Sequence, residues 1–489
     1  MLFNSLEFLV FFPTVVIIYF LLPHRFRWVM LLAASYYFYM CWKPEYVVLI
    51  MVSTLIDYFA GLRMGRLGRK TKRRKYLLLS LLANIGLLFS FKYFNFFSES
   101  ARLLLAEFNI FYGSPVLDVL LPVGISFYTF QTLSYTIDVY RGARPPERHL
   151  GIFALYVSFF PQLVAGPIER STRLLPQFLE KKSVDVQRMA DGVRLMMFGF
   201  FKKVVIADRL AVYVNNVYNH PDDHSGLTLI VATYFFAIQI YCDFSGYSNI
   251  AIGAARVLGY DLMTNFNRPY ISRSVAEFWK RWHISLSSWF KDYLYIPLGG
   301  NRVGRWRWHY NIAVVFLVSG LWHGANWTFL AWGMLHGIYL MASTWTRDWR
   351  DRMWRLVRPS GNERLRLGLS IFITFHLVLF AWIFFRANSI GDAWVILQGI
   401  AETSLTNFKL DIPAGFHREN LMFAWFELLL AGLSVAVMAF ISHIHRNQEL
   451  RLFMGGRARW QRWAVDYALI LGIFLMGVYE HAEFIYFQF

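Results

Sequence analysis

The residue whose type and setting most suggest chemistry is a histidine in an apolar stretch. Residues 311–345 are largely apolar, and His323 stands among them in the sequence LWHGAN. The ordinary pKa of imidazole is near 6.5, so a neutral ring is available as a general base at neutral pH. The alternative is a structural histidine that is satisfied by a carbonyl group or packed against Trp322 and Trp327. From these residues alone, both interpretations stay open.

Two other histidines are candidate partners of His323. His283 lies in the run WHIS, and its spacing alone favours a hydrogen-bonded interfacial residue over a catalytic one. His336 follows His323 by thirteen residues, roughly 20 Å along an ideal helix, so the two cannot share a metal ion unless the helix breaks. The chain has no HExxH and no GxSxG, and Cys41 and Cys242 have no CxxC partner. We therefore predict no metal site and no disulfide, and find no motif for zinc-peptidase or serine-hydrolase chemistry.

Charged residues also occur in two other apolar stretches. Asp243, in YCDFSGYSNIAIG, is predicted to cap a helix or to pack as a polar group, with the orientation of a catalytic histidine as the alternative. Lys202 and Lys203, in FGFFKKVVIADR, are predicted to extend their ammonium groups toward a membrane interface.

The composition indicates that a membrane holds these residues in place. Of 489 residues, 57% are hydrophobic and only 16% charged, whereas soluble chains carry about 25% charged residues. Apolar runs approach the roughly 20 residues that a helix needs to cross a bilayer core. The first five predicted crossings are residues 8–22, 28–42, 46–62, 76–97 and 120–139, and the last three are residues 367–385, 421–441 and 463–479.

The basic residues predict the orientation of these helices. The net charge is +18, and basic loops at residues 25–27, 63–75 and 141–148 follow the first, third and fifth crossings. Such loops face the cytoplasm, so the N-terminus is predicted outside. The basic stretches 347–366 and 446–462 predict that residues 480–489 also lie outside. This placement explains the positive charge without nucleic acid.

The same rule predicts that residues 311–345 enter the membrane and return, because both flanks are basic. As a helix, residues 311–322 would rise only about 18 Å, too little to cross a core of about 30 Å. The turn would therefore lie inside the membrane or near its outer boundary, with His323 at or beside the apex. Gly320 and Gly324 fit a tight reversal or a close helix contact. An ionisable residue placed there is a functional candidate by default.

The middle of the chain is less regular. Residues 152–164, 196–206 and 227–258 are short or interrupted, which predicts half-spans, interfacial helices or re-entrant pieces. Residues 265–310 mix basic and aromatic side chains, which is typical of an amphipathic segment at the cytoplasmic face. That segment is either a lipid anchor or a docking surface for an anionic ligand, such as the phosphates of coenzyme A or an acidic carrier protein, and composition does not separate the two.

We therefore predict an all-α polytopic membrane protein with about ten to twelve transmembrane helices plus re-entrant and interfacial helices. Residues 1–489 form one membrane domain, with N-terminal helices in 1–150, a core carrying the candidate site in 151–345 and C-terminal helices in 346–489.

Several motifs give the chain a resemblance that covers nearly its whole length. In order they are MLFNSLEFLVFFP, LPVGISFYTFQTLSYTIDVYRG, FPQLVAGPIER, QIYCDFSGYSNIAIGAARVLGY, FWKRWHISLSSWFKDYLYIPLGGNR, SGLWHGANWTFLAWGMLHG and FIYFQF. Through them the chain resembles the membrane-bound O-acyltransferase family, in its bacterial branch of alginate O-acetyltransferases and teichoic-acid D-alanine transferases.

The resemblance implies a fold around a central funnel and a bacterial inner-membrane location, with both predicted outer termini in the periplasm. It also implies that the family's essential histidine is His323 and that the second motif histidine is His283. The donor would be acetyl-coenzyme A or another acyl thioester, with no permanently bound cofactor. The implied partners are membrane lipid, periplasmic acetyl-transfer proteins, polysaccharide synthase machinery and an acyl carrier.

The leading hypothesis is O-acetylation of an alginate-like exopolysaccharide. Nothing in the motifs distinguishes alginate from cellulose or another exopolysaccharide as acceptor. Three alternatives stay open: D-alanyl transfer to teichoic acid, a transporter or flippase of polymer precursors, and a non-enzymatic scaffold for which His323 would be dispensable.

Overall fold

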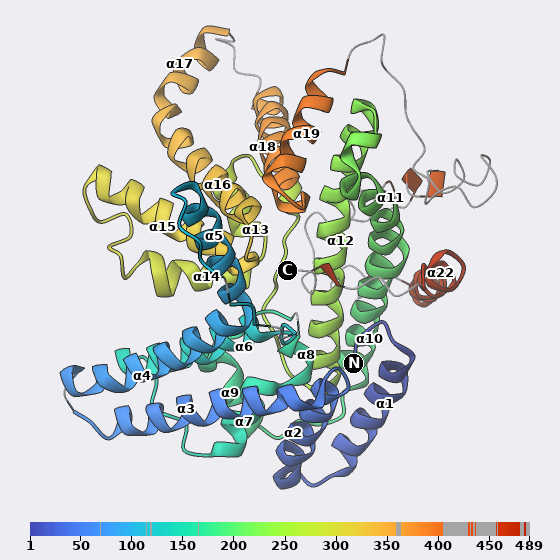
Figure 1. The fold of residues 1–489 in the computed structure, drawn as a ribbon. Helices are drawn as coiled ribbons and strands as arrows, with labels where there is room; N and C mark the ends of the chain where they lie inside the picture. Colours follow the sequence, from blue (N-terminus) through green and yellow to red (C-terminus); the bar gives the residue numbers. More distant parts are fainter. Residues whose placement is uncertain are drawn as a thin grey trace. The chain divides into compact units, whose positions relative to one another are not determined.

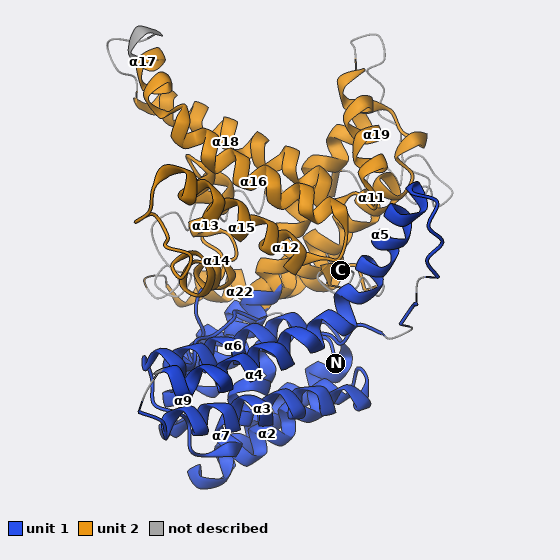
Figure 2. Ribbon diagram, turned by 60° about the vertical axis from the view of Figure 1, so that its left-hand side comes forward, with its two compact units in different colours: residues 1–196, 247–264 blue, residues 197–246, 265–489 orange. Residues whose placement is uncertain are grey.

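Every regular element in the described part of the computed structural model is helical (Figure 1). The structure describes residues 1–68, 70–113, 115–117, 120–164, 166–357, 363–403 and 458–479, with residues 429, 430, 432, 433, 436, 456, 484 and 485. The predicted crossing at 421–441 and most of the basic stretch 446–462 lie outside the described residues. The chain divides into two compact units, which Figure 2 colours separately: residues 1–196 with 247–264, and residues 197–246 with 265–489.

The first unit contains the five predicted N-terminal crossings, and each of them is helical. They are α1 (Leu6–Leu21), α2 (His24–Met40), α3 (Val47–Gly65), α4 (Lys70–Leu88), which continues through a π-helical turn into α5 (Phe94–Glu107), and α6 (Ile125–Arg141). Two further segments are short, as predicted, because the helix breaks at Phe159 between α7 (Leu150–Ser158) and α8 (Phe160–Leu163). The unit also includes α9 (Ser171–Leu179) and most of α10 (Val186–Phe200).

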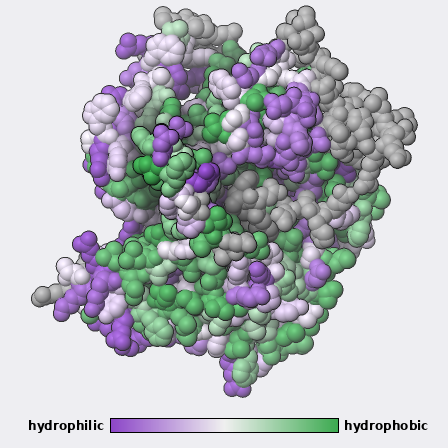
Figure 3. Space-filling view, viewed as in Figure 1, coloured by the Kyte–Doolittle hydropathy of each residue, from purple (hydrophilic) through white to green (hydrophobic). Residues whose placement is uncertain are grey.

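Helices α3, α4 and α6 pack against one another around a buried carboxylate. Asp57 of α3 accepts hydrogen bonds from Ser80 and Asn84 of α4, the latter at 2.9 Å from Nδ2 to Oδ2. These donors satisfy a group that would otherwise be costly to bury. On the outer side of α4, Leu79 and Leu82 are largely exposed. Figure 3 shows many apolar side chains at the surface of the region that contains α3 and α4.

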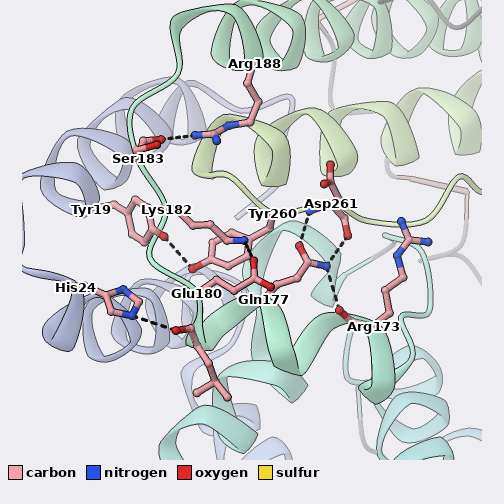
Figure 4. A network of polar contacts seen from close by, with 11 residues as sticks. Tyr19, His24, Arg173, Gln177, Glu180, Lys182, Ser183, Arg188, Tyr260 and Asp261 are labelled. Carbon is pink, nitrogen blue, oxygen red and sulfur yellow. Dashed lines mark hydrogen bonds and ion pairs between the residues drawn. The ribbon is translucent and has the colours of Figure 1, made fainter.

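Polar contacts fix the far end of α12 (Gly226–Leu258) within the first unit (Figure 4). Gln177 of α9 accepts a hydrogen bond from the backbone N–H of Asp261 at 2.8 Å and donates to its carbonyl oxygen at 3.0 Å. The hydroxyl groups of Tyr19 and Tyr260 lie 2.9 Å apart. These bonds join α1, α9 and the segment after α12, so the loop that leads toward residue 265 begins from a fixed point.

The second unit holds the candidate site. After a π-helical turn at Phe201–Ala207 come α11 (Asp208–Asn219), the first part of α12, α13 (Val275–Arg281), α14 (Ile284–Phe290), a π-helical turn at Lys291–Tyr295, α15 (Arg305–His323), α16 (Trp327–Trp345), α17 (Arg347–Val357), α18 (Glu363–Arg386), α19 (Ile390–Ala401) and α22 (Arg459–Met476). Helix α16 packs against both α15 and α18, and these three elements enclose the predicted catalytic region.

Two predictions for the middle of the chain were wrong. Residues 227–258 are not interrupted, because α12 is one continuous helix of 33 residues. Residues 196–206 belong to helical chain that runs through α10, the π-helical turn and α11 without a break. The irregularity that the sequence suggested is a widened turn inside a helix, a feature that often accompanies functional sites.

Among the described residues, four helices are long and apolar enough to cross a membrane by length and composition: Pro44–Gly65, Thr71–Glu107, Gly226–Leu258 and Glu363–Arg386. They support the membrane class. The count of about ten to twelve crossings stays a prediction, as does the arrangement of residues 1–489 as one domain.

Candidate active site

A helical hairpin places His323. Helix α15 ends at His323, the chain turns through residues 324–326, and α16 begins at Trp327. Asn326 caps α16, because its side-chain oxygen accepts a hydrogen bond from the N–H of Thr328 at 3.0 Å. The predicted reversal is confirmed, but α15 has 19 residues and rises about 28 Å, much more than the predicted first arm. Arm length therefore no longer argues that the turn lies inside the bilayer, and the depth of His323 stays a prediction.

Glycines allow the two arms to approach closely. A Cβ atom added to Gly320 would collide with the carbonyl oxygen of Phe329, and one added to Gly333 would collide with the carbonyl oxygen of Phe316. Such contacts through small residues are typical of helices that pack within membranes. The predicted role of Gly320 in a close helix contact is thus confirmed.

Aromatic rings surround the His323 side chain, which is only 3% exposed. Its ring centroid lies 4.9 Å from that of Trp322, 4.8 Å from that of Trp332 and 5.3 Å from that of Phe385, and all three pairs meet edge to face. Trp332 comes from α16 and Phe385 from α18, so three helices build the pocket wall. An imidazole in such a setting is shielded from bulk water, which strengthens its electrostatic interactions with a bound group.

His283 lies at the start of α14 and is fully buried. Its Nδ1 lies 3.1 Å from Oδ1 of Asn265, which also accepts hydrogen bonds from the backbone N–H and the hydroxyl of Ser285. Because a backbone N–H donates to this Asn265 atom, the atom is the carbonyl oxygen, and Nδ1 of His283 must carry a proton. Nε2 therefore holds the lone pair. Burial lowers the pKa of His283 to about 3, so the ring is neutral at physiological pH.

The indole of Trp322 joins the two predicted site histidines. Its ring centroid is 5.8 Å from that of His283 on one side and 4.9 Å from that of His323 on the other. Phe244 of α12 packs on the opposite side of His283 at 4.6 Å. The structure thus brings together two histidines that are forty residues apart in the sequence.

His336 occupies a different place in the same aromatic cluster. Trp332 lies between it and His323, with centroids 5.1 Å and 4.8 Å away. The indole N–H of Trp279 donates to Nδ1 of His336 at 3.3 Å. Across the described ranges, no group of three or more His, Cys, Asp or Glu residues is arranged to hold a metal ion. His336 is accordingly a hydrogen-bonded core residue.

A cavity of about 160 Å³ opens beside α15. Its wall is mostly apolar and includes Trp279, Phe290 and Phe316, while its polar groups come from Ser287, Lys291 and Ser319. Ser319 lies one helical turn before His323, hence on the same side of α15. Lys291, which also lines the cavity, is an exposed basic residue.

Comparison with known proteins identifies the family of this chain. Residues 149–382 match the membrane-bound O-acyltransferase family. A probable alginate O-acetylase of Azotobacter vinelandii is 41% identical over 81% of this chain and 77% of its own length. The chain belongs to the membrane-bound O-acyltransferase family.

Two further relatives are named for other activities. A peptidoglycan O-acetyltransferase of Helicobacter pylori is 32% identical over 94% of this chain and 91% of its own length. A teichoic acid D-alanyltransferase of Streptococcus thermophilus is 31% identical, but over only 56% of this chain and 69% of its own length. This O-acyltransferase is therefore similar along most of its length to acetyl-transferring members of the family.

The prediction for the two lysines of this O-acyltransferase was wrong, whereas Asp243 packs as a polar group, one of the two predicted roles. Lys203 does not extend to an interface: it is 2% exposed, and its Nζ lies 2.8 Å from Asp208 Oδ1 and 2.8 Å from Asp243 Oδ1. Asp243 lies inside α12 rather than at a helix start, and its other oxygen accepts the N–H of Ile485 at 2.8 Å. Lys202 is also buried, 3.2 Å from the hydroxyl of Ser245. Carboxylates and a hydroxyl group within the same unit therefore stabilise the ammonium groups in place of water.

Sequence reasoning did not find Trp332, Phe385 or Asn265, which shape the pockets of the two histidines. The two rings are ordinary aromatic residues of apolar helices, and Asn265 is separated from His283 by eighteen residues. Asn265 is the first residue of the basic and aromatic segment 265–310. The short polar string NFN is the one local signal that could have drawn attention to it.

Proposed function

We propose that this membrane-bound O-acyltransferase moves an acetyl group from a cytoplasmic thioester toward hydroxyl groups of an extracytoplasmic polysaccharide, directly or through a partner protein. The donor is acetyl-coenzyme A or another acyl thioester, and His323 is the general base. The observation that carries the proposal is the burial of His323 at the α15–α16 turn, next to Trp322, Trp332 and Phe385 and one turn from an apolar cavity.

In the proposed reaction, neutral His323 accepts the proton of the acceptor hydroxyl as its oxygen attacks the thioester carbonyl carbon. The carbon–sulfur bond breaks, the ester forms, and the thiolate leaves and is protonated by the imidazolium. Positioned proton transfer of this kind contributes about 10² to 10⁴ in rate. Alignment of donor and acceptor contributes further.

The cavity beside α15 suits the donor. Its apolar wall and the charge of Lys291 fit a thioester arm that ends in anionic groups. His283 is assigned a positioning role for the thioester or its leaving group, since its Nε2 holds a lone pair. Periplasmic acetyl-transfer proteins and polysaccharide synthase machinery would complete delivery to the polymer, and an acyl carrier is the alternative donor.

The test is mass spectrometry of the cell's polymers in strains that produce the wild-type protein, His323→Ala or His309→Ala. His309 is the matched control, because it lies on the same helix, where it accepts a hydrogen bond from Trp345. We expect acetylated polymer with wild type and His309→Ala and at least about 10²-fold less with His323→Ala at equal protein level. Normal acetylation in His323→Ala would contradict the proposed base.

The same spectra and a transport assay separate the alternatives. D-alanyl esters in place of acetyl esters would indicate the teichoic-acid reaction. Purified protein that moved a polymer precursor across a vesicle membrane without cleaving the thioester would indicate a transporter. The location in the bacterial inner membrane, with both termini in the periplasm, belongs to this proposal as well.

A further inference from the structure

A buried arginine with amide partners lies beside the candidate active site. Arg386 is the last residue of α18, directly after Phe385, whose ring packs on His323. Its guanidinium group donates to the side-chain oxygens of Asn215 at 2.8 Å, Asn219 at 3.4 Å and Asn388 at 3.4 Å. We call these four residues the Arg386 cluster.

The cluster is continuous with the His323 hairpin. Asn326, which caps α16 three residues after His323, donates from Nδ2 to the backbone oxygen of Asn388 at 2.9 Å. Asn388 in turn donates to Asn219 at 3.3 Å. Asn219 and Asn388 are exposed, while Arg386 is only 8% exposed. The cluster therefore leads from the protein surface to the wall of the His323 pocket.

The charge of Arg386 is not balanced within the described part of the chain. There, its partners are the three asparagine side chains and the ring of Tyr218, whose centroid lies 5.6 Å from the guanidinium carbon. Lys203, in the same unit, shows the usual solution, since two carboxylates flank its ammonium group. A buried cation without an acid is costly. Neutral side chains would join α11 to α18 at lower cost, so the charge itself needs an explanation.

A ligand with both a carboxylate and hydroxyl groups would explain it. Guanidinium binds carboxylate in a planar, two-pronged geometry. Asparagine amides offer both a donor and an acceptor to neighbouring hydroxyls. The exposed indole of Trp327, next to Asn326 in the chain, adds an aromatic face of the kind on which sugar rings stack.

We propose that the Arg386 cluster is the acceptor-specificity site of this enzyme and that it binds a carboxylated sugar unit of a polysaccharide, with Arg386 on the carboxylate. The inference rests on the proposed function, because it assigns the cluster to the acceptor side of His323. It predicts that the enzyme distinguishes a uronic-acid polymer from a neutral polymer before any acyl transfer occurs.

Binding of two hexasaccharides to the purified full-length protein tests this proposal. One probe is a (1→4)-linked uronic-acid hexamer and the other is the neutral (1→4)-linked glucose hexamer. The variants are Arg386→Gln, which removes the charge, and Asn388→Asp, which supplies a carboxylate to the guanidinium from an exposed residue. Arg364→Gln is the matched control, an arginine at the opposite, exposed end of α18.

We expect wild type and Arg364→Gln to bind the uronic-acid hexamer at least about tenfold more tightly than the neutral one, since hydrogen bonds to charged groups are the stronger kind. Arg386→Gln and Asn388→Asp should lose that preference. Equal binding of both probes by wild type, or an unchanged preference in Asn388→Asp, would overturn the proposal. Should Arg386→Gln fail to fold, Asn388→Asp decides alone. Since binding is measured without a thioester, loss of the proposed transferase function would leave this result independent.

Discussion

His283 adopts a backbone conformation that residues other than glycine rarely take. Its φ and ψ are 43° and 55°, in the left-handed helical region. For an L-residue this conformation costs roughly 1–2 kcal/mol, because the Cβ atom approaches the following carbonyl oxygen. Strain of this kind persists where surrounding contacts enforce it and is concentrated at functional sites. Here Asn265, Phe244 and Trp322 hold the ring, and the backbone must follow.

Two substitutions separate the energetic cost of the left-handed backbone conformation at His283 from the function of its ring. His283→Gly and His283→Ala both remove imidazole, but only glycine relieves the strain. We expect His283→Gly to have a free energy of unfolding roughly 1 kcal/mol higher than that of His283→Ala, while acetyl transfer falls at least about tenfold in both. Thermal unfolding and an acetyl-transfer assay measure the two effects. If activity recovers in step with stability in His283→Gly, the ring has no role in the reaction.

At this scale, the apolar setting of His323 made it a candidate, whereas His283 became one only through the resemblance, and the catalytic role of both stays a prediction. The sequence did not predict Arg386, because an arginine that ends an apolar helix is also the usual mark of a cytoplasmic or interfacial boundary. It misplaced Lys203 because the partner that stabilises the ammonium group, Asp243, is forty residues away in another helix. Pairing across such distances leaves no local pattern.

Among the elements, the α15–α16 hairpin matters most, because it fixes where His323 lies. Its two helices are in contact through Gly320 and Gly333, with no room for a further methyl group between the backbones. Adding one to a tightly packed contact typically costs about 1–3 kcal/mol. It would also shift the α15 terminus that carries His323.

We therefore expect Gly320→Ala to lower the free energy of unfolding by about 1–3 kcal/mol and to reduce acetyl transfer more than His309→Ala does. Gly368→Ala, in α18, is the control, because no atom lies within 4 Å of its added Cβ. It should leave stability unchanged or slightly raised, since alanine favours helix. Thermal unfolding of both variants measures the difference. A Gly320→Ala protein as stable as the control would show that the arms can separate without harm.

Four of the five N-terminal helices were predicted to within about five residues because long apolar runs alternate with basic loops, whereas the helical stretch Lys70–Glu107 extends beyond the predicted 76–97 at both ends. Helix α12 was predicted to be interrupted because Asp243, Ser245 and Gly246 lower its local hydropathy. In the structure these residues meet Lys203, Lys202 and the backbone of Gly199, so polar contacts and close packing sustain the helix. A hydropathy scale scores each residue as if lipid surrounded it, whereas these residues contact other parts of the protein.

At the scale of the whole molecule, the net charge of +18 and the apolar helices together predict one orientation of the chain in a membrane. The length of the helical stretch Thr71–Glu107 can be compared directly with the thickness of a bilayer core. Lys72, at its basic end, and Glu99 are about 40 Å apart along the helix axis, more than a bilayer core of about 30 Å. The two residues should therefore lie on opposite sides, with Lys72 in the cytoplasm.

Cysteine labelling tests this orientation directly. Cys41 is exposed and Cys242 is buried, so a Cys41→Ser protein should react little with a thiol-labelling reagent. Into it we would introduce Lys72→Cys or Glu99→Cys, both at exposed residues. A maleimide that cannot cross membranes should label Glu99→Cys in intact spheroplasts and Lys72→Cys only after the membrane is opened. The reverse pattern would invert every crossing and place the His323 hairpin on the other face, which would exclude acceptor access from outside through the Arg386 cluster.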